Sequence, residues 1–257
     1  MRPQRSWAFA KQDLRLVRRD PVPFVALVLM PLVLIVFLRP MVKASLISAG
    51  HPGANGSEQA VPGMAVMFSA FLVGQVGFNL FREHGWRTWD RMRASSATSL
   101  EMMAGKTVTP LLLIATQLAL LFGIGAVVFG LRVQGTWTAI AVVGATLATC
   151  LVALGFAVAA LCRTSDQVIM VGNVGSMLLA GLGGALAPIA LLPEWARHVA
   201  PAMPTYWAMK GFQQAIFDSA GASHVAVSAV VLLVFAAGFA VFAMVRFRLD
   251  DAKAFRS

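Results

Sequence analysis

The chain has 257 residues, of which 58% are hydrophobic and 12% charged, and its mean hydropathy is +0.76. Soluble domains typically contain about 45–50% apolar and about 25% charged residues, so this composition excludes an ordinary soluble enzyme, a disordered chain and a typical nucleic-acid-binding domain. A membrane-spanning helix needs about 20 apolar residues, which leaves room here for several spans joined by short loops. We therefore expect a single all-α integral membrane domain over residues 1–257.

Residues 1–21 have the pattern of an amphipathic helix. Trp7, Ala10, Leu14 and Val17 share one face at helical spacing, and Lys and Arg residues occupy the other faces. This pattern predicts a helix in the membrane interface that contacts membrane lipids and ends before the prolines at positions 21 and 23. The segment could be a passive anchor or a contact surface for a cytoplasmic partner.

Six continuous apolar runs follow, at 22–43, 61–81, 107–129, 138–161, 168–190 and 223–245. Continuous runs of this length predict six transmembrane helices, because the strands of a membrane barrel would be shorter and alternate in polarity. Sixteen Lys and Arg residues flank one side of these spans and five flank the other. The positive-inside rule then places both termini in the cytoplasm of a multi-pass protein in a bacterial cytoplasmic membrane. The net charge of +10 follows from this topology, and we expect no nucleic-acid partner.

The cytoplasmic loop 82–106 is longer than the roughly 2–8 residues that join neighbouring helices. It combines charges of both signs with Trp86 and Trp89, which suits docking into another protein, although the two rings could instead anchor the loop in the interface. Gly105-Lys106-Thr107 resembles the end of a phosphate-binding loop, but the first glycine of that motif would fall at Leu100. We therefore expect no nucleotide site in this chain.

The segment 191–222 is predicted to form an outer re-entrant hairpin before the last span. It contains three prolines, and its apolar stretch 204–217 is too short to cross a membrane. The run before it, Val168 to Leu192, is expected to be one helix of 25 residues, rich in glycines that allow close packing or bending.

No catalytic or metal-binding set is apparent. Cys150 and Cys162 would lie roughly 18 Å apart along one helix, too far for a disulfide. All the acidic residues lie outside the span cores, which counts against a proton-coupled carrier, so the energy for transport must come from elsewhere. The candidate substrate contacts are neutral polar or aromatic residues, each of which could instead join helices: Gln75, Asn79, Gln117, Asn173 and Tyr206.

In the loop 82–106, acidic, glycine, threonine and basic residues recur in a characteristic order: Glu83, Gly85, Thr88, Asp90, Arg91, Gly105 and Lys106. With the six spans, the N-terminal helix and the outer hairpin, this loop resembles that of the type-2 ABC transporter permeases, particularly the daunorubicin-resistance branch of bacterial drug exporters. Two departures are Ser95-Ser96-Ala97, where Thr/Ser-Pro is usual, and the bulky Trp86 and Trp89. The outer element Pro204-Thr205-Tyr206-Trp207 matches only loosely.

The resemblance implies that the loop is a coupling helix that docks on an ATPase subunit. Its contacts would come from Glu83, Gly85, Trp86, Thr88, Trp89, Asp90 and Arg91. Two permease chains, identical or related, would pair and bind two cytoplasmic ATPases. The chain would bind no cofactor and would not itself be an enzyme, because ATP and Mg²⁺ would be held by the partner subunits.

The function implied is outward export of a drug, a lipid-like molecule or a related hydrophobic cargo, with polysaccharide export left open. One alternative is a membrane scaffold or immunity protein without transport, which would be insensitive to ATP. Another is an enzyme that modifies lipids, for which His84 with Glu83 and Asp90 is the one weak candidate cluster.

Overall fold

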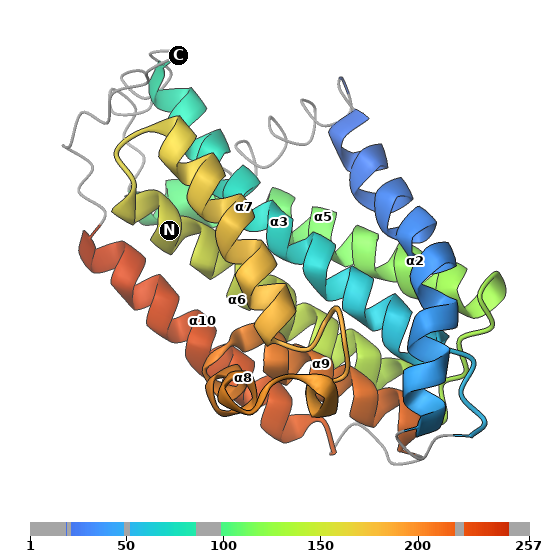
Figure 1. Cartoon of the computed structure of the whole chain (residues 1–257). Helices are drawn as coiled ribbons and strands as arrows, with labels where there is room; N and C mark the ends of the chain where they lie inside the picture. Colours follow the sequence, from blue (N-terminus) through green and yellow to red (C-terminus); the bar gives the residue numbers. More distant parts are fainter. Residues whose placement is uncertain (1–18, 20–21, 49–51, 86–98, 219–223, 247–257) are drawn as a thin grey trace.

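The computed structural model describes residue 19 and residues 22–48, 52–85, 99–218 and 224–246 (Figure 1). This part of the chain is helical and contains no strand. Two short 3₁₀ segments, η1 and η2, lie on either side of the short helix α8. In chain order these elements are α2 (Val22–Ser48), α3 (Ser57–Gly85), α5 (Ser99–Val127), α6 (Trp137–Leu161), α7 (Ser165–Leu182), η1 (Ile189–Leu191), α8 (Glu194–Val199), η2 (Ala200–Ala202), α9 (Pro204–Phe217) and α10 (Ala226–Arg246).

Five of the described helices are long and apolar enough to cross a membrane: α2, α3, α5, α6 and α10. They correspond to the first four and the last of the six predicted apolar runs, so the prediction of an all-helical membrane protein is confirmed. The remaining run gives α7, which has 18 residues and carries Asp166, Gln167 and Asn173 among its apolar residues. The interfacial helix predicted over residues 1–21 lies outside the described residues apart from Arg19.

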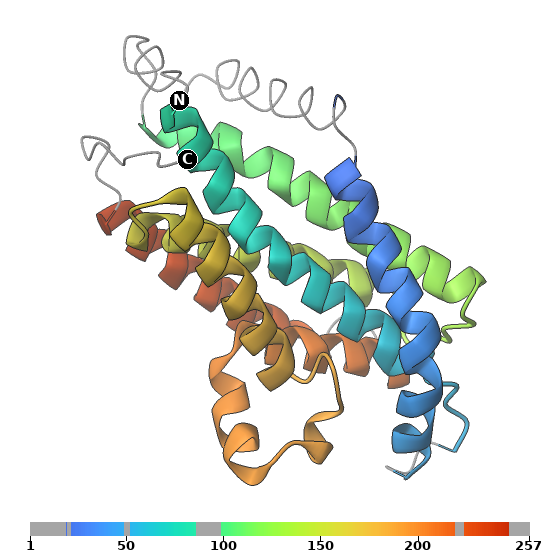
Figure 2. The same cartoon turned by 45° about the horizontal axis from the view of Figure 1, so that its top comes forward.

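Helix α3 lies at the centre of the bundle. It packs against α2, α5, α6, α7 and α9, and 78% of its span is buried inside the chain, whereas 17% of the α2 span is buried. Two views show the bundle from different sides, with α2 at one flank and α10 at the other (Figures 1 and 2). We call the end that holds residues 52–59, 128–136 and 183–218 the α9 end, and the opposite end the Gly85 end.

Several helix boundaries follow from local sequence. The Thr136 side chain accepts a hydrogen bond from the Ala139 N–H at the start of α6, and Thr164 does the same for Gln167 at the start of α7. Pro204 opens α9, where its missing N–H costs no helical hydrogen bond. Local sequence therefore explains why these helices begin where they do.

Helix α7 ends earlier than the sequence analysis predicted. A single helix from Val168 to Leu192 was expected, but α7 stops at Leu182 and Gly183 donates its N–H to the Leu179 carbonyl. Gly184 then adopts a φ of +80°, a conformation that favours glycine, and the chain leaves the helix. The segment after it extends from the bundle as a loop with short helical turns (Figure 2).

Helices α3 and α7 pack together through glycines. A Cβ atom added to Gly172 would overlap the backbone of Gly74, and the Ser176 hydroxyl donates a 2.6 Å hydrogen bond to the Ala70 carbonyl. Small residues therefore let the two backbones touch, as they commonly do in membrane helix pairs. The Ser176 bond adds a polar link in the same contact.

Gln117 replaces a backbone hydrogen bond that a proline removes. Within α2, the Leu27 carbonyl would normally accept from the N–H of residue 31, but residue 31 is a proline and has no N–H. The Gln117 Nε2 of α5 donates to this carbonyl at 3.4 Å, while the Ser69 hydroxyl of α3 donates to Gln117 Oε1 at 3.4 Å. Gln117 is fully buried and thus joins α2, α3 and α5.

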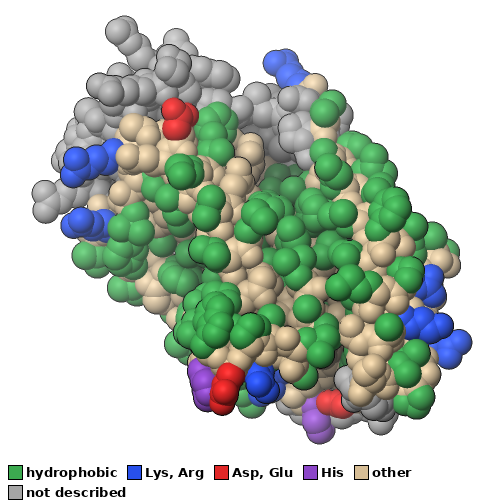
Figure 3. Space-filling model, viewed as in Figure 1, with side chains coloured by type: hydrophobic (Ala, Val, Ile, Leu, Met, Phe, Trp, Pro, Cys, Tyr) green, Lys and Arg blue, Asp and Glu red, His purple; other side chains and the backbone are tan. Residues whose placement is uncertain are grey.

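The surface agrees with a membrane location. Hydrophobic side chains cover the middle of the face shown in Figure 3, and charged side chains lie toward its ends. Many large apolar residues are exposed on α2, α7 and α10, where water would disfavour them and lipid would not. Cys150 and Cys162 are both buried, and no disulfide joins them, as their spacing along the chain predicts.

Gly172→Ala should destabilise the protein by about 2 kcal/mol, because its methyl group would force the α3 and α7 backbones apart. Thermal unfolding of the purified chain in detergent would measure the effect. Gly175→Ala is the matched control on the same helix, since a Cβ there meets nothing within 4 Å. Equal melting temperatures for the two variants would contradict close packing at Gly172.

Gln117→Leu should cost about 1 kcal/mol of stability in the wild-type background. The cost should shrink in a Pro31→Ala background, because an alanine at this position supplies the N–H that the Leu27 carbonyl lacks. A double-mutant cycle on thermal unfolding measures the coupling between the two substitutions. The stability that Gln117→Leu still costs in the Pro31→Ala background measures the contribution of the hydrogen bond to Ser69. An identical cost in both backgrounds would show that Gln117 does not act through this carbonyl.

Candidate functional site

Three of the exposed carboxamide side chains on α3 and α7 have no hydrogen-bond partner among the described residues. Gln75 and Asn79 belong to α3, and Asn173 belongs to α7. None of the three makes a side-chain hydrogen bond to another described residue. A primary amide left unpaired in an apolar environment costs free energy, so their presence on this surface requires a polar neighbour.

The helix contacts place these carboxamides together. Helices α3 and α7 run antiparallel, because Ala70 meets Ser176 and Gly74 meets Gly172. In an antiparallel pair, the residue that follows each contact position is turned by about 100° to the same side of the pair. Gln75 follows Gly74 and Asn173 follows Gly172, so both lie on one side, and Asn79 lies one helical turn from Gln75. We call Gln75, Asn79 and Asn173 the carboxamide patch.

The other two predicted pathway residues lie elsewhere. Gln117 is buried, and its hydrogen bonds to Ser69 and Leu27 use both ends of its amide within the bundle. Tyr206 is half-buried in the first turn of α9, where its ring packs edge-on against Trp207 with centroids 5.3 Å apart. The structure therefore brings together three of the five residues that the sequence singled out.

The predicted ATPase-coupling residues lie at and beyond the end of α3. Glu83 and Gly85 belong to the last turn of this helix, and Lys106 lies in α5, which begins at Ser99. The remaining predicted contacts lie outside the described residues: Trp86, Thr88, Trp89, Asp90 and Arg91. The end of α3 and the start of α5 thus mark the two ends of the predicted coupling segment, and both lie at the Gly85 end.

Sequence reasoning missed a polar cluster at the α9 end. The fully buried Gln59 donates a 2.8 Å hydrogen bond to the Gly184 carbonyl and accepts a 2.6 Å bond from Gln213 Nε2. These bonds join α3, the loop after α7 and α9. The one available signal was the polar stretch 57–59, which precedes the apolar run that begins at residue 61.

A second group of hydrogen bonds caps the start of α3. Glu58 is buried, and its carboxylate accepts hydrogen bonds from the N–H groups of Asn55 and Gly56 at 3.1 Å each. The Ser57 hydroxyl donates to the Phe129 carbonyl, and Asn55 Nδ2 donates to the Gly130 carbonyl. The loop before α3 is thereby fastened to the turn after α5.

Comparison with known proteins agrees with this architecture. Residues 4–217 match the ABC-2 type transporter family. The chain is 27% identical over 202 residues to the linearmycin resistance permease protein LnrN of Bacillus subtilis (strain 168), an alignment that covers 77% of this chain and 52% of LnrN. The chain thus spans about half the length of this curated relative. No solved structure matches.

The resemblance stated from the sequence is confirmed by the family match, which covers most of the chain. A bundle with five helices of membrane-spanning length and an apolar exterior is consistent with it. The chain belongs to the ABC-2 type transporter family.

Proposed function

We propose that the chain is the membrane subunit of an ABC exporter that moves a hydrophobic drug or lipid-like cargo outward across the cytoplasmic membrane. The family match and the similarity to a resistance permease support this role. In the proposed complex, two copies of the chain, or this chain and a related one, pair in the membrane. Two cytoplasmic ATPases bind ATP and Mg²⁺ and supply the energy, so the chain needs no cofactor of its own.

The family match carries the exporter role, and the carboxamide patch supports a cargo path within it. Gln75, Asn79 and Asn173 are exposed on helices whose other exposed residues are largely apolar, including Met170, Val171, Val174, Met177 and Leu178. Amides in such a position are favourable where they line a polar path or meet a second chain, and unfavourable against lipid. We assign this side of α3 and α7 to the cargo path between paired permease chains, with Tyr206 at its α9 end.

In this proposal α7 is the sixth span. Its 18 residues give a helix about 27 Å long, close to the roughly 30 Å thickness of the hydrocarbon layer. Six spans place both termini and the segment 82–106 on the cytoplasmic side, and the α9 end on the outer side. Helix α9 would then be the second arm of the re-entrant segment 191–222, since a helix of 14 residues is too short to span.

The first experiment is affinity purification of the full chain from its native host, followed by mass spectrometry and an ATPase assay in lipid. A co-purifying nucleotide-binding protein with vanadate-sensitive activity is the expected result. A chain that purifies alone and behaves independently of ATP would refute the exporter and favour a membrane scaffold.

Glu83→Ala and Asp90→Ala should each reduce ATPase activity stimulated by the permease several-fold, a coupling change on the order of 1–2 kcal/mol. Membrane insertion should be unchanged, because both residues are expected to contact the ATPase rather than the bundle. Asp166→Ala is a suitable control, since it removes an exposed carboxylate from the first turn of α7 at the same end. Wild-type ATPase stimulation and transport in both variants would remove the loop from the mechanism.

Replacing the carboxamide patch by alanine (Gln75→Ala, Asn79→Ala and Asn173→Ala together) should change the cargo response of ATPase activity by about tenfold or more in apparent affinity. The reason is that each amide offers hydrogen bonds that alanine cannot make. Thr149→Ala serves as the control, because Thr149 is exposed on α6 and its hydroxyl bonds to its own helix. If the triple variant keeps the wild-type cargo profile, the patch serves helix packing instead.

A further inference from the structure

Lys210 is a cation in an otherwise uncharged helix. It lies in the middle of α9, whose sequence from Pro204 to Phe217 contains no acidic residue. One face of α9 is buried against α3, α6, α7 and α10, and Lys210 is half-buried on the opposite face. Lys210 forms no ion pair with any carboxylate in the part of the chain that the structure describes.

One aromatic ring lies beside the Lys210 ammonium, and a second ring packs against the first. Its Nζ lies 5.1 Å from the centroid of the Trp207 ring, one helical turn earlier. The Trp207 ring is held in place, because its Nε1 donates a 2.9 Å hydrogen bond to the Pro201 carbonyl and Tyr206 packs edge-on against it. The aromatic face attracts the ammonium, but the ring carries no net negative charge that would neutralise it.

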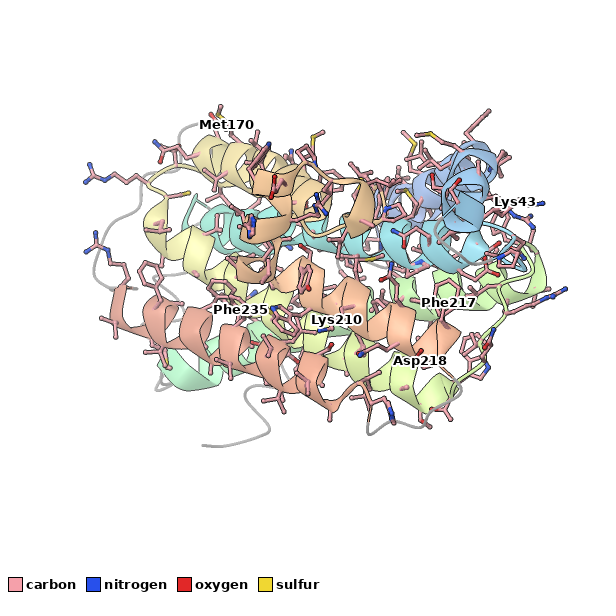
Figure 4. All side chains as sticks on the ribbon, turned by 60° about the horizontal axis from the view of Figure 1, so that its bottom comes forward. Lys43, Met170, Lys210, Phe217, Asp218 and Phe235 are labelled. Atoms are coloured by element: carbon pink, nitrogen blue, oxygen red, sulfur yellow. The ribbon has the colours of Figure 1, made fainter. Side chains whose placement is uncertain are left out.

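The bundle near this ammonium carries apolar side chains on a neighbouring helix. Helix α10 packs beside α9, and its exposed residues include Val227, Val230 and Val234. Figure 4 shows Lys210 on α9 and Phe235 on α10, with Lys43 at a separate position on α2. A ligand at Lys210 would therefore meet one positive charge and the Trp207 ring, with the Tyr206 ring packed behind it.

We propose that Lys210, Trp207 and Tyr206 form a binding site for an anionic amphiphile, in which the ammonium pairs with a phosphate or carboxylate headgroup and the rings contact the adjoining apolar chain. The partly exposed ammonium has no anion to neutralise it among the described residues, and an anion from outside the chain supplies this charge. Fixed aromatic rings with one apolar face and one polar edge are typical of sites at the headgroup level of a membrane. The proposal does not require transport and stands independently of the exporter function.

Native mass spectrometry of the full chain, released from an uncharged detergent, would test the site. Dioleoyl phosphatidylglycerol supplies the anionic probe and dioleoyl phosphatidylcholine the zwitterionic one. Lys210→Gln should reduce phosphatidylglycerol binding about fivefold and leave phosphatidylcholine binding unchanged, whereas Lys210→Arg should retain the preference. The retained preference in Lys210→Arg, together with an unchanged melting temperature, separates loss of the site from loss of folding.

The matched control is Lys43→Gln, which removes an exposed cation from α2 without touching α9. Phosphatidylglycerol binding should be unchanged in this variant. Wild-type anionic preference in Lys210→Gln, or an equal loss in Lys43→Gln, would overturn the proposal, because general surface charge would then explain the binding.

Competition identifies the chemistry of the ligand. Displacement of the bound lipid by dodecyl phosphate, but not by inorganic phosphate at the same concentration, is the expected result and supports an amphiphile. Equal displacement by both would overturn the role of the aromatic rings. If dodecyl phosphate also stimulates ATPase activity of the assembled complex through Lys210, the amphiphile is cargo; if it binds without stimulation, the site holds a lipid.

Discussion

The contact between α3 and α7 depends on Gly74 and Gly172, whose backbones meet because neither residue carries a side chain. Helix α3 is the most buried span, so the position of α7 against it sets where the loop after α7 begins and where α9 can pack. The Thr205 hydroxyl of α9 donates to the Leu179 carbonyl near the end of α7, which links the two elements directly. The same close approach turns Gln75 and Asn173 to one side of the pair. The packing of the bundle and the position of the candidate site thus both require residues without side chains at positions 74 and 172.

A second constraint is the hydrogen bonding of polar groups away from water. In an apolar medium an unpaired backbone carbonyl costs several kcal/mol, so each break in a helix needs a substitute partner. Gln117 provides one at the Leu27 carbonyl, which Pro31 leaves open, and Gln59 provides another at the Gly184 carbonyl beyond α7. These two side chains satisfy the carbonyls that prolines and glycines leave without a partner. The bundle can therefore include a loop and a short helix at the α9 end.

Two groups of polar residues can therefore be distinguished within the described bundle. Gln59 and Gln117 are buried and have their hydrogen bonds within the bundle, so they stabilise it. The carboxamide patch and Lys210 lack such partners among the described residues. The amides have hydrogen-bonding groups without partners and the ammonium has no counter-ion, so we assign both to contacts with other molecules. The two proposals centre on different parts of the surface, the side of α3 and α7 for cargo and α9 for an anionic amphiphile, and Tyr206 belongs to both.

The sequence by itself determined the class of the protein. Length, hydropathy and run spacing predicted a helical membrane protein, and the order of residues in the loop 82–106 indicated the family, because these properties depend on composition and local pattern. The same reasoning chose Gln75, Asn79, Gln117 and Asn173 as equivalent polar residues in spans. Only the tertiary structure separated Gln117 from the others, because a hydrogen bond to a carbonyl on another helix cannot be seen in one helix's pattern. It also shortened α7 and joined Gln59 to Gln213, which are 154 residues apart in the chain. Side-chain roles in this bundle are decided by neighbours distant in sequence, and those neighbours are fixed only when the helices pack.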